Sequence, residues 1–117
     1  MEYKRCDRVA DLLQQEIADL LLRRVKDPRV TGVVLTGVEV SDDLRHARVF
    51  FCITGTVAET DKENAILGLN KAKGFMRQEL GKRLTMKHLP QLDFRYDGSF
   101  EYGEKIERLL KELHKDE

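Results

Sequence analysis

The apolar residues near the start of the chain recur every three or four positions, which is the period of one helix face. This pattern predicts an amphipathic helix over residues 5–26, and the Asp27-Pro28 pair ends it because the residue before a proline disfavours helical angles. The positions on the apolar face are Val9, Leu12, Leu13, Ile17, Leu20 and Leu21.

Two segments with strand character follow this helix. Residues 33–40 (VVLTGVEV) are rich in β-branched side chains, and Gly37 predicts a bulge or a close-packing point within the strand. Residues 47–53 alternate between the two faces of a second strand, and the polar cluster at 41–46 (SDDLRH) is typical of a turn. The two strands are therefore predicted to form a hairpin.

A helical pattern then resumes, with a glycine in its middle. Residues 60–63 have the spacing of a capping box, and the apolar positions that follow are Ala65, Ile66, Leu69, Met76, Leu80 and Leu84. A glycine inside a helix costs roughly 1 kcal/mol relative to alanine, so Gly74 needs a reason. We expect either a kink between two helical pieces or a bare patch that another backbone can approach.

The remaining pattern predicts a third strand at 92–97 and a last helix whose apolar positions run from 102 to 113. The predicted order is helix, two strands, two helical pieces, strand and helix, which makes an α+β fold with a three-stranded sheet. A chain of 117 residues with 41% hydrophobic residues suits a single domain over residues 1–117, with a frayed charged end at 115–117.

Charge changes this picture only locally. The chain has 21 basic and 21 acidic residues and a formal net charge of +0, so any basic surface must be confined to a part of the molecule. No segment has the length and apolarity of a membrane span, and the N-terminus lacks the apolar block of a signal peptide, which favours a cytoplasmic location. The mixed charges and the lack of a long apolar surface stripe favour a monomer.

The residues that commonly carry catalysis or metals are scattered. Cys6 and Cys52 are far apart and are expected to be reduced, partly buried thiols, and the three histidines lack metal-binding spacing. No carboxylate pair accompanies a candidate nucleophile. The sequence therefore predicts no enzyme, no metal and no cofactor.

The positive signal is a basic segment between residues 70 and 88. Its only acid is Glu79, and its cations are Lys71, Lys73, Arg77, Lys82, Arg83 and Lys87. On a helix, the face opposite the apolar positions would hold Lys71, Gly74, Gln78, Gly81 and Lys82. Cations beside glycines suit a phosphate backbone, although an ordinary solvated helix face gives the same pattern.

Other residues would extend this surface only if the fold brings them alongside it. The basic candidates are Arg5 and Arg8 on the first helix and Lys26 and Arg29 near Pro28. Two aromatic residues, Phe50 and Phe75, lie off the inward faces, and we expect them in a second core layer rather than stacked on bases.

The predicted order, with a basic joint between two helical pieces, resembles the type II KH domain, whose GxxG loop at that joint holds a nucleic-acid backbone. Here the joint reads Ala72-Lys73-Gly74, an AxG in place of GxxG, as in the bacterial ribosome-binding factor A family. The resemblance extends over nearly the whole chain, through Arg5 and Arg8 and the segments DPRV, VEVSDDLRHARV, LNKAKGFMRQEL and LPQLDFRYDGS.

That resemblance implies a KH type II-like fold with helices on one face of the sheet, and a non-enzymatic factor for ribosome assembly. Such a factor binds free, immature small (30S) ribosomal subunits and assists late maturation and 5′-end processing of the 16S rRNA precursor, with a role in cold adaptation. Its partners would be that subunit, its RNA and other assembly factors. The implied RNA-binding residues are Lys71, Lys73 and Arg77, around a kink at Ala72 to Gly74, with Lys82, Arg5 and Arg8 as further candidates.

Two other classes of function remain open at this point. The first is a protein-interaction module that binds a partner helix or strand edge, for which the lysines serve only solvation and affinity is nearly independent of salt. The second is a small hydrolase built from scattered histidine and aspartate residues.

Overall fold

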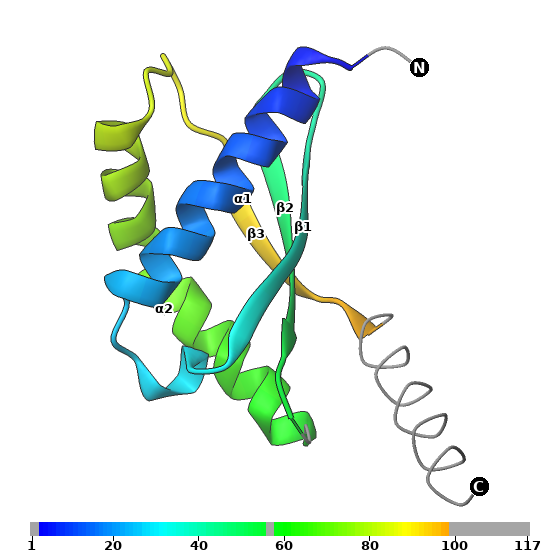
Figure 1. The fold of residues 1–117 in the computed structure, drawn as a ribbon, viewed down its shortest axis with the longest axis vertical. Helices are drawn as coiled ribbons and strands as arrows, with labels where there is room; N and C mark the ends of the chain where they lie inside the picture. Colours follow the sequence, from blue (N-terminus) through cyan, green and yellow to red (C-terminus); the bar gives the residue numbers. More distant parts are fainter. Residues whose placement is uncertain (1–2, 56–57, 99–117) are drawn as a thin grey trace, which may run out of the picture.

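The computed structural model describes residues 3–55 and 58–98, and its elements follow the predicted order (Figure 1). The predicted last helix at 102–113 and the charged end at 115–117 lie outside the described residues. Neither described helix is long and apolar enough to cross a membrane. The elements are α1 (Arg5–Arg23), η1 (Pro28–Val30), β1 (Val33–Val40), β2 (His46–Ile53), α2 (Glu59–Arg83) and β3 (Gln91–Tyr96).

The three strands form one mixed sheet in the order β1-β2-β3. Strands β1 and β2 are antiparallel and form the predicted hairpin, whereas β3 runs parallel to β2. The register between β1 and β2 shifts between Leu35 and Gly37, which leaves one extra residue on β1. The predicted bulge at Gly37 is therefore confirmed to within a residue.

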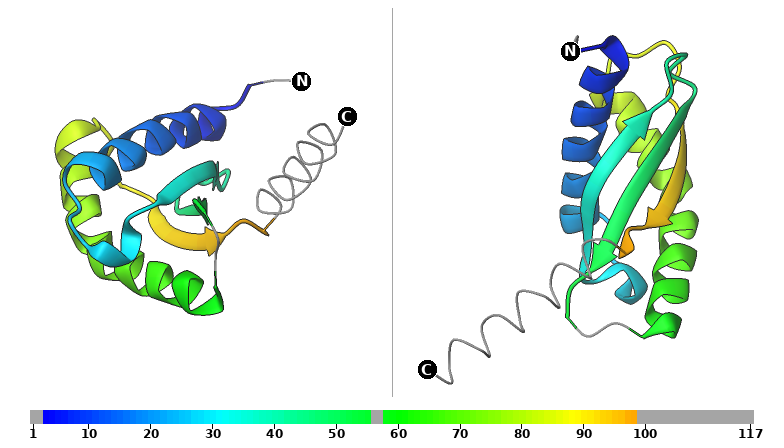
Figure 2. Two further views of the ribbon diagram at one scale, coloured as in Figure 1. Left: turned by 60° about the horizontal axis from the view of Figure 1, so that its bottom comes forward. Right: turned by 90° about the vertical axis from the view of Figure 1, so that its right-hand side faces the viewer.

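Both helices cover the same face of the sheet, and the described residues leave the other face uncovered (Figure 2). Alternate residues of the sheet point into the core, and they meet the apolar faces of α1 and α2 there. This arrangement confirms the α+β fold with helices on one face. The fully enclosed core side chains include Leu13, Ile17, Val49, Phe51, Leu69, Met76 and Leu80.

Helix α1 ends at Arg23, three residues before the predicted end at 26. The backbone N–H groups of Arg24 and Val25 both donate to the carbonyl oxygen of Leu20, at 2.8 and 3.0 Å, and so close the last turn. The chain then enters η1, a short 3₁₀ helix that the apolar pattern did not predict because its single turn is too short to show a period.

Helix α2 is continuous from Glu59 to Arg83, so the two predicted helical pieces are joined without a break. It changes direction about midway along its length (Figures 1 and 2), and residues 72–74 lie in that middle part by sequence. A bend rather than a break keeps the backbone hydrogen bonds of the helix, and glycine is a common residue at such bends. The predicted kink is thus present as a bend.

The start of α2 also differs from the prediction. The helix begins at Glu59, and Asp61 accepts a hydrogen bond of 3.0 Å from the backbone N–H of Ala58, the residue just before the helix. The box predicted at 60–63 is therefore shifted toward the N-terminus. A carboxylate in the first turn satisfies an otherwise unpaired donor and interacts favourably with the helix dipole.

A glycine that the sequence analysis passed over sets how closely α2 packs on η1. Gly68 is buried, and a Cβ at this position would lie 2.9 Å from Cγ1 of Val30 and 3.1 Å from Cβ of Arg29. Only glycine fits this contact without a shift of the neighbours. The available signal was its position three residues after Ala65 on the inward face of the helix.

Candidate nucleic-acid interface

The middle and end of α2 present a surface with cations and little bulk. The five residues of the predicted face are all exposed, and we call them the exposed stripe: Lys71, Gly74, Gln78, Gly81 and Lys82. A Cβ at Gly74 would meet nothing within 4 Å. Gly74 is therefore not a packing glycine, and its backbone is open to an approaching chain.

Of the two cations in this stripe, Lys82 forms an ion pair, whereas Lys71 forms none among residues 3–55 and 58–98. Nearby Arg29 is bound to Asp27. The Asp27 carboxylate accepts from the backbone N–H of Arg29 at 2.9 Å, from Nε at 3.0 Å and from Nη2 at 2.6 Å.

These contacts hold the turn before η1 in a charge-paired state. The hydrogen bonds from the Arg29 side chain and backbone, with smaller contributions from the charges of Arg29 and Lys71, lower the pKa of Asp27 from 3.8 to about 2. The fold therefore does bring Arg29 alongside α2, as the sequence analysis allowed. Asp27 is hydrogen-bonded to Arg29, and Lys71 acts on Asp27 only at longer range, without an ion pair among the described residues.

Two of the predicted binding residues lie away from the exposed stripe. Lys73 and Arg77 are half-buried, and the Arg77 Nη2 donates 3.3 Å to the carbonyl oxygen of Leu89, in the segment that leads to β3. The Arg77 Nε is buried, with no partner in the described part of the chain. Ala72 packs against the core. Arg77 thus holds the segment before β3 through Leu89, and it also carries a positive charge.

Lys82 belongs to a small charge network at the junction of the two helices. Glu79 lies 3.6 Å from Lys82 Nζ and 3.8 Å from Nη2 of Arg24, the residue that follows α1. The guanidinium carbon of Arg24 lies over the Phe75 ring, 5.7 Å from its centroid. Sequence reasoning missed Arg24, because only the packing of α1 against α2 brings it here.

The exposure of Phe75 contradicts the expectation that it belongs to a second core layer. Its side chain is 36% exposed, so it is not part of a second core layer. Phe50, the other aromatic residue predicted for that layer, is half-buried on β2 opposite Gly37. The neighbour Met76 is fully buried, which shows that the core side of α2 passes through residue 76 and leaves residue 75 at the margin of the exposed stripe.

Arg5 and Arg8 are exposed but lie elsewhere. The ion pairs between α1 and α2 involve Glu16 and Asp19, which both bind Arg83 Nη1, at 2.9 and 2.8 Å. Arg5 precedes Glu16 by about 16 Å along the helix axis at 1.5 Å per residue. The fold therefore does not bring Arg5 and Arg8 alongside the exposed stripe, and any contact they make is a separate one.

The two cysteines are thiols buried at different places, as predicted. Burial and a 3.6 Å hydrogen bond to Asp42 raise the pKa of the Cys6 thiol above its ordinary value of 9.0. Within residues 3–55 and 58–98, no group of three or more His, Cys, Asp or Glu residues is placed to hold a metal ion.

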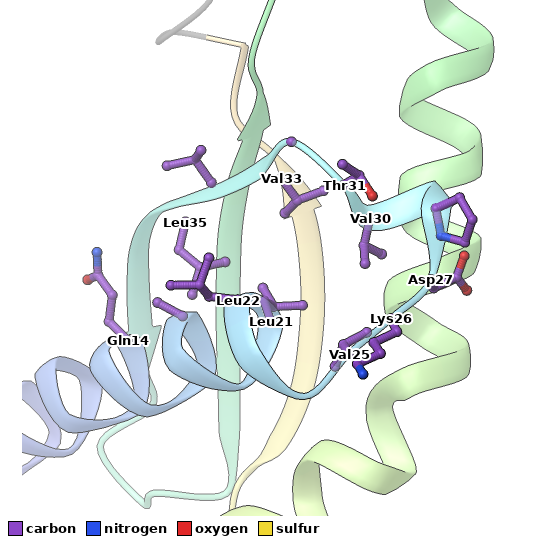
Figure 3. Close-up of a pocket in the computed structure, with 14 residues that line it drawn as sticks. Gln14, Leu21, Leu22, Val25, Lys26, Asp27, Val30, Thr31, Val33 and Leu35 are labelled. Atoms are coloured by element: carbon purple, nitrogen blue, oxygen red, sulfur yellow. The ribbon is translucent and has the colours of Figure 1, made fainter.

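An apolar groove of about 640 Å³ lies between the end of α1 and the start of β1 (Figure 3). Its lining includes Leu21, Leu22 and Val25 from the helix end and Val33 and Leu35 from the strand. Leu22 is 82% exposed. The lining is apolar on both sides, so the groove suits an apolar side chain better than a phosphate group.

The helices, the mixed sheet and the basic bend of α2 define a protein of the type II KH-like class. A crystal structure of ribosome-binding factor A from Thermus thermophilus has this fold, with a TM-score of 0.69, 22% identity, and coverage of 78% of this chain and 93% of that one. A homology model of the T. thermophilus factor, fitted into a cryo-electron microscopy map of its complex with the 30S subunit, aligns with a TM-score of 0.62 and 22% identity over 76% and 91%.

Sequence comparison gives the particular family. The family profile for ribosome-binding factor A matches residues 5–110, and ribosome-binding factor A of Syntrophobacter fumaroxidans is 68% identical over 117 residues, covering all of both chains. This chain belongs to the ribosome-binding factor A family. The family is non-enzymatic, so the hypothesis of a small hydrolase is wrong.

Proposed function

We propose that this protein is an assembly factor that binds free small ribosomal subunits and assists late maturation of their RNA. In this proposal it acts in the cytoplasm as one domain, supports processing at the 5′ end of the 16S rRNA precursor and contributes to cold adaptation. The observation that carries the proposal is membership of the family at 68% identity over the full chain. The complex of the T. thermophilus relative with the 30S subunit supports the same partner.

The contact with RNA is proposed to lie on the exposed stripe of α2. Lys71 and Lys82 would each neutralise a phosphate, and the open backbone at Gly74 lets the RNA strand approach the helix closely. Ala72 shapes the bend, and the half-buried Lys73 and Arg77 add positive potential at its side. Arg5 and Arg8 would form a second, separate contact.

Charge reversal tests this site. We expect Lys71→Glu to weaken binding to purified small subunits by roughly tenfold or more in a pelleting assay at low salt, because one charge-assisted phosphate contact is replaced by repulsion. Arg45→Glu is the matched control, since Arg45 is exposed in the turn between β1 and β2 and carries the same change of charge. Circular dichroism verifies that both variants are folded.

Equal binding of wild type, Lys71→Glu and Arg45→Glu would reject the exposed stripe as the RNA contact. Equal weakening of both variants would show a general effect of charge rather than a site. Only selective loss in Lys71→Glu supports the assignment.

The apolar groove favours a second candidate function, which is binding of a protein partner such as another assembly factor. The exposed Leu22 would then be the central contact. This function predicts that Leu22→Asp abolishes binding to the partner, that Lys71→Glu has no effect and that affinity changes little with salt.

A further inference from the structure

Phe75 occupies an unusual position for an aromatic residue in this protein. Its side chain is 36% exposed, although aromatic side chains make up only 7% of the sequence and Phe51 and Phe94 are buried. At 100° per residue, Phe75 lies about 40° around the helix from Lys71 and about 20° from Lys82. The exposed ring thus faces the same side of α2 as Lys71 and Lys82, which lie about one and two helical turns away along the axis.

The structure also places charged groups around this ring. Arg24 lies over the ring at 5.7 Å from its centroid, and Glu79, one turn further along α2, lies 3.8 Å from Arg24 and 3.6 Å from Lys82. Glu79 therefore pairs with both cations, and of the two it is Arg24 that lies over the Phe75 ring. This contact joins α1 to α2 and fixes the arginine in place before any ligand binds.

We propose that Phe75, together with Arg24, is a stacking site for an unpaired base of the RNA whose backbone runs along the exposed stripe. Aromatic rings and arginine planes are the surfaces on which proteins stack unpaired bases. The phosphates on either side of that base reach Lys71 and Lys82, and Gly74 leaves room for the sugar. This inference rests on the proposed function and adds the kind of nucleotide that the site accepts.

The surrounding charge favours RNA over an apolar protein segment at this position. Arg24 lies over the ring, Lys71 and Lys82 lie on the same side of α2 about one and two turns away, and Glu79 pairs with Arg24 and Lys82 but not with Lys71. The apolar groove is different, because Leu21, Leu22 and Val25 line it without a comparable set of cations. An aromatic ring bordered by cations matches a base bordered by phosphates.

The first test separates the aromatic face from apolar bulk. Phe75→Leu retains apolar volume and removes the ring, and we expect it to bind purified small subunits about tenfold to a hundredfold more weakly than wild type. Phe75→Tyr retains the ring and should bind within about twofold of wild type. Circular dichroism and a urea melt establish that each variant is folded.

The second test observes the base directly. The sequence contains no tryptophan, so Phe75→Trp introduces a single fluorophore at the proposed site. We expect small subunits to quench its fluorescence, because stacked bases quench an indole ring. Leu67→Trp is the control, since Leu67 is 58% exposed on the first half of the same helix, and its fluorescence should change little.

The outcomes distinguish this inference from the proposed function. If wild type does not bind subunits, the proposed function fails and the stacking site fails with it. If wild type binds, and Phe75→Leu binds equally well, only the stacking site is wrong. Weaker binding of Phe75→Leu without quenching in Phe75→Trp would show a protein contact at this ring and would also overturn base stacking.

Discussion

Two glycines of the same helix have opposite roles at the scale of single residues. Gly68 is buried against Val30 and Arg29, whereas a Cβ at Gly74 would face open space. Sequence reasoning singled out Gly74, because it interrupts a basic segment, and passed over Gly68. The distinction depends on which element packs on each glycine, and the sequence pattern of one helix does not contain that information.

Alanine substitutions should therefore have opposite effects on stability. We expect Gly68→Ala to lower the free energy of unfolding by about 1–3 kcal/mol, because the added methyl group overlaps Val30 and Arg29. Gly74→Ala should raise it by up to about 1 kcal/mol through helix propensity. Urea unfolding measures both values, and a Gly68→Ala variant as stable as wild type would contradict the packing described here.

Because Asp27 is hydrogen-bonded to Arg29 in the turn at η1, we expect the free energy of unfolding to depend on pH. The pKa of Asp27 is about 2 in the folded protein, below its ordinary value of 3.8, so the folded state binds this proton less readily than the unfolded state. The contribution of Asp27 is complete above about pH 4 and is lost as the pH falls toward 2. Urea unfolding of wild type and Asp27→Asn should give a stability difference that shrinks over this range, and a constant difference would contradict it.

At the scale of elements, apolar periodicity predicted α1, alternation predicted β2 and β3, and β-branched residues predicted β1. Gly37 and the polar cluster at 41–46 added the bulge and the hairpin turn. These patterns were not sufficient for α2, where a glycine in a basic segment suggested two pieces and the structure has one bent helix. Local propensity disfavours glycine, but continuous core contacts through Leu69, Met76 and Leu80 keep the helix intact across the bend. Tertiary packing outweighs a cost of roughly 1 kcal/mol.

Hydrogen exchange can verify the continuity of α2. The amide groups of residues 74–77 should be protected to a degree similar to those of residues 65–69, because each has a helical partner four residues earlier. The amides of Asp42 and Asp43, in the exposed turn between β1 and β2, provide the unprotected reference. Exchange at 74–77 as fast as in that turn would show two helices joined by an open segment.

At the scale of the whole molecule, a protein with no net charge can form a basic binding surface when some of its cations are held in ion pairs and others are not. Arg83 is paired with Glu16 and Asp19 and so joins α2 to α1, whereas Arg29 is paired with Asp27 within the turn at η1. Lys71 forms no ion pair within the described residues. The sequence indicated the basic segment, but it could not show which cations form ion pairs, and it left open whether Arg5 and Arg8 lie beside Lys71.

The lack of an ion pair at Lys71 within the described residues leads to a prediction for how the binding constant depends on salt concentration. If Lys71 contacts one phosphate, the logarithm of the binding constant should fall less steeply with the logarithm of salt concentration in Lys71→Ala than in wild type, by a slope of about 1. Binding of small subunits at four or more salt concentrations gives both slopes. Identical slopes would mean that Lys71 is solvated in the complex and contacts no phosphate.

The most direct test of the whole account is co-sedimentation of this protein with isolated small ribosomal subunits, at low and at physiological salt, with complete ribosomes as the comparator. An assembly factor that contacts phosphates should bind free subunits, with an affinity that falls as the salt concentration rises. It should not bind complete ribosomes. A folded protein that binds neither particle, or whose binding is unaffected by salt, would contradict this account and would favour a protein partner in the apolar groove.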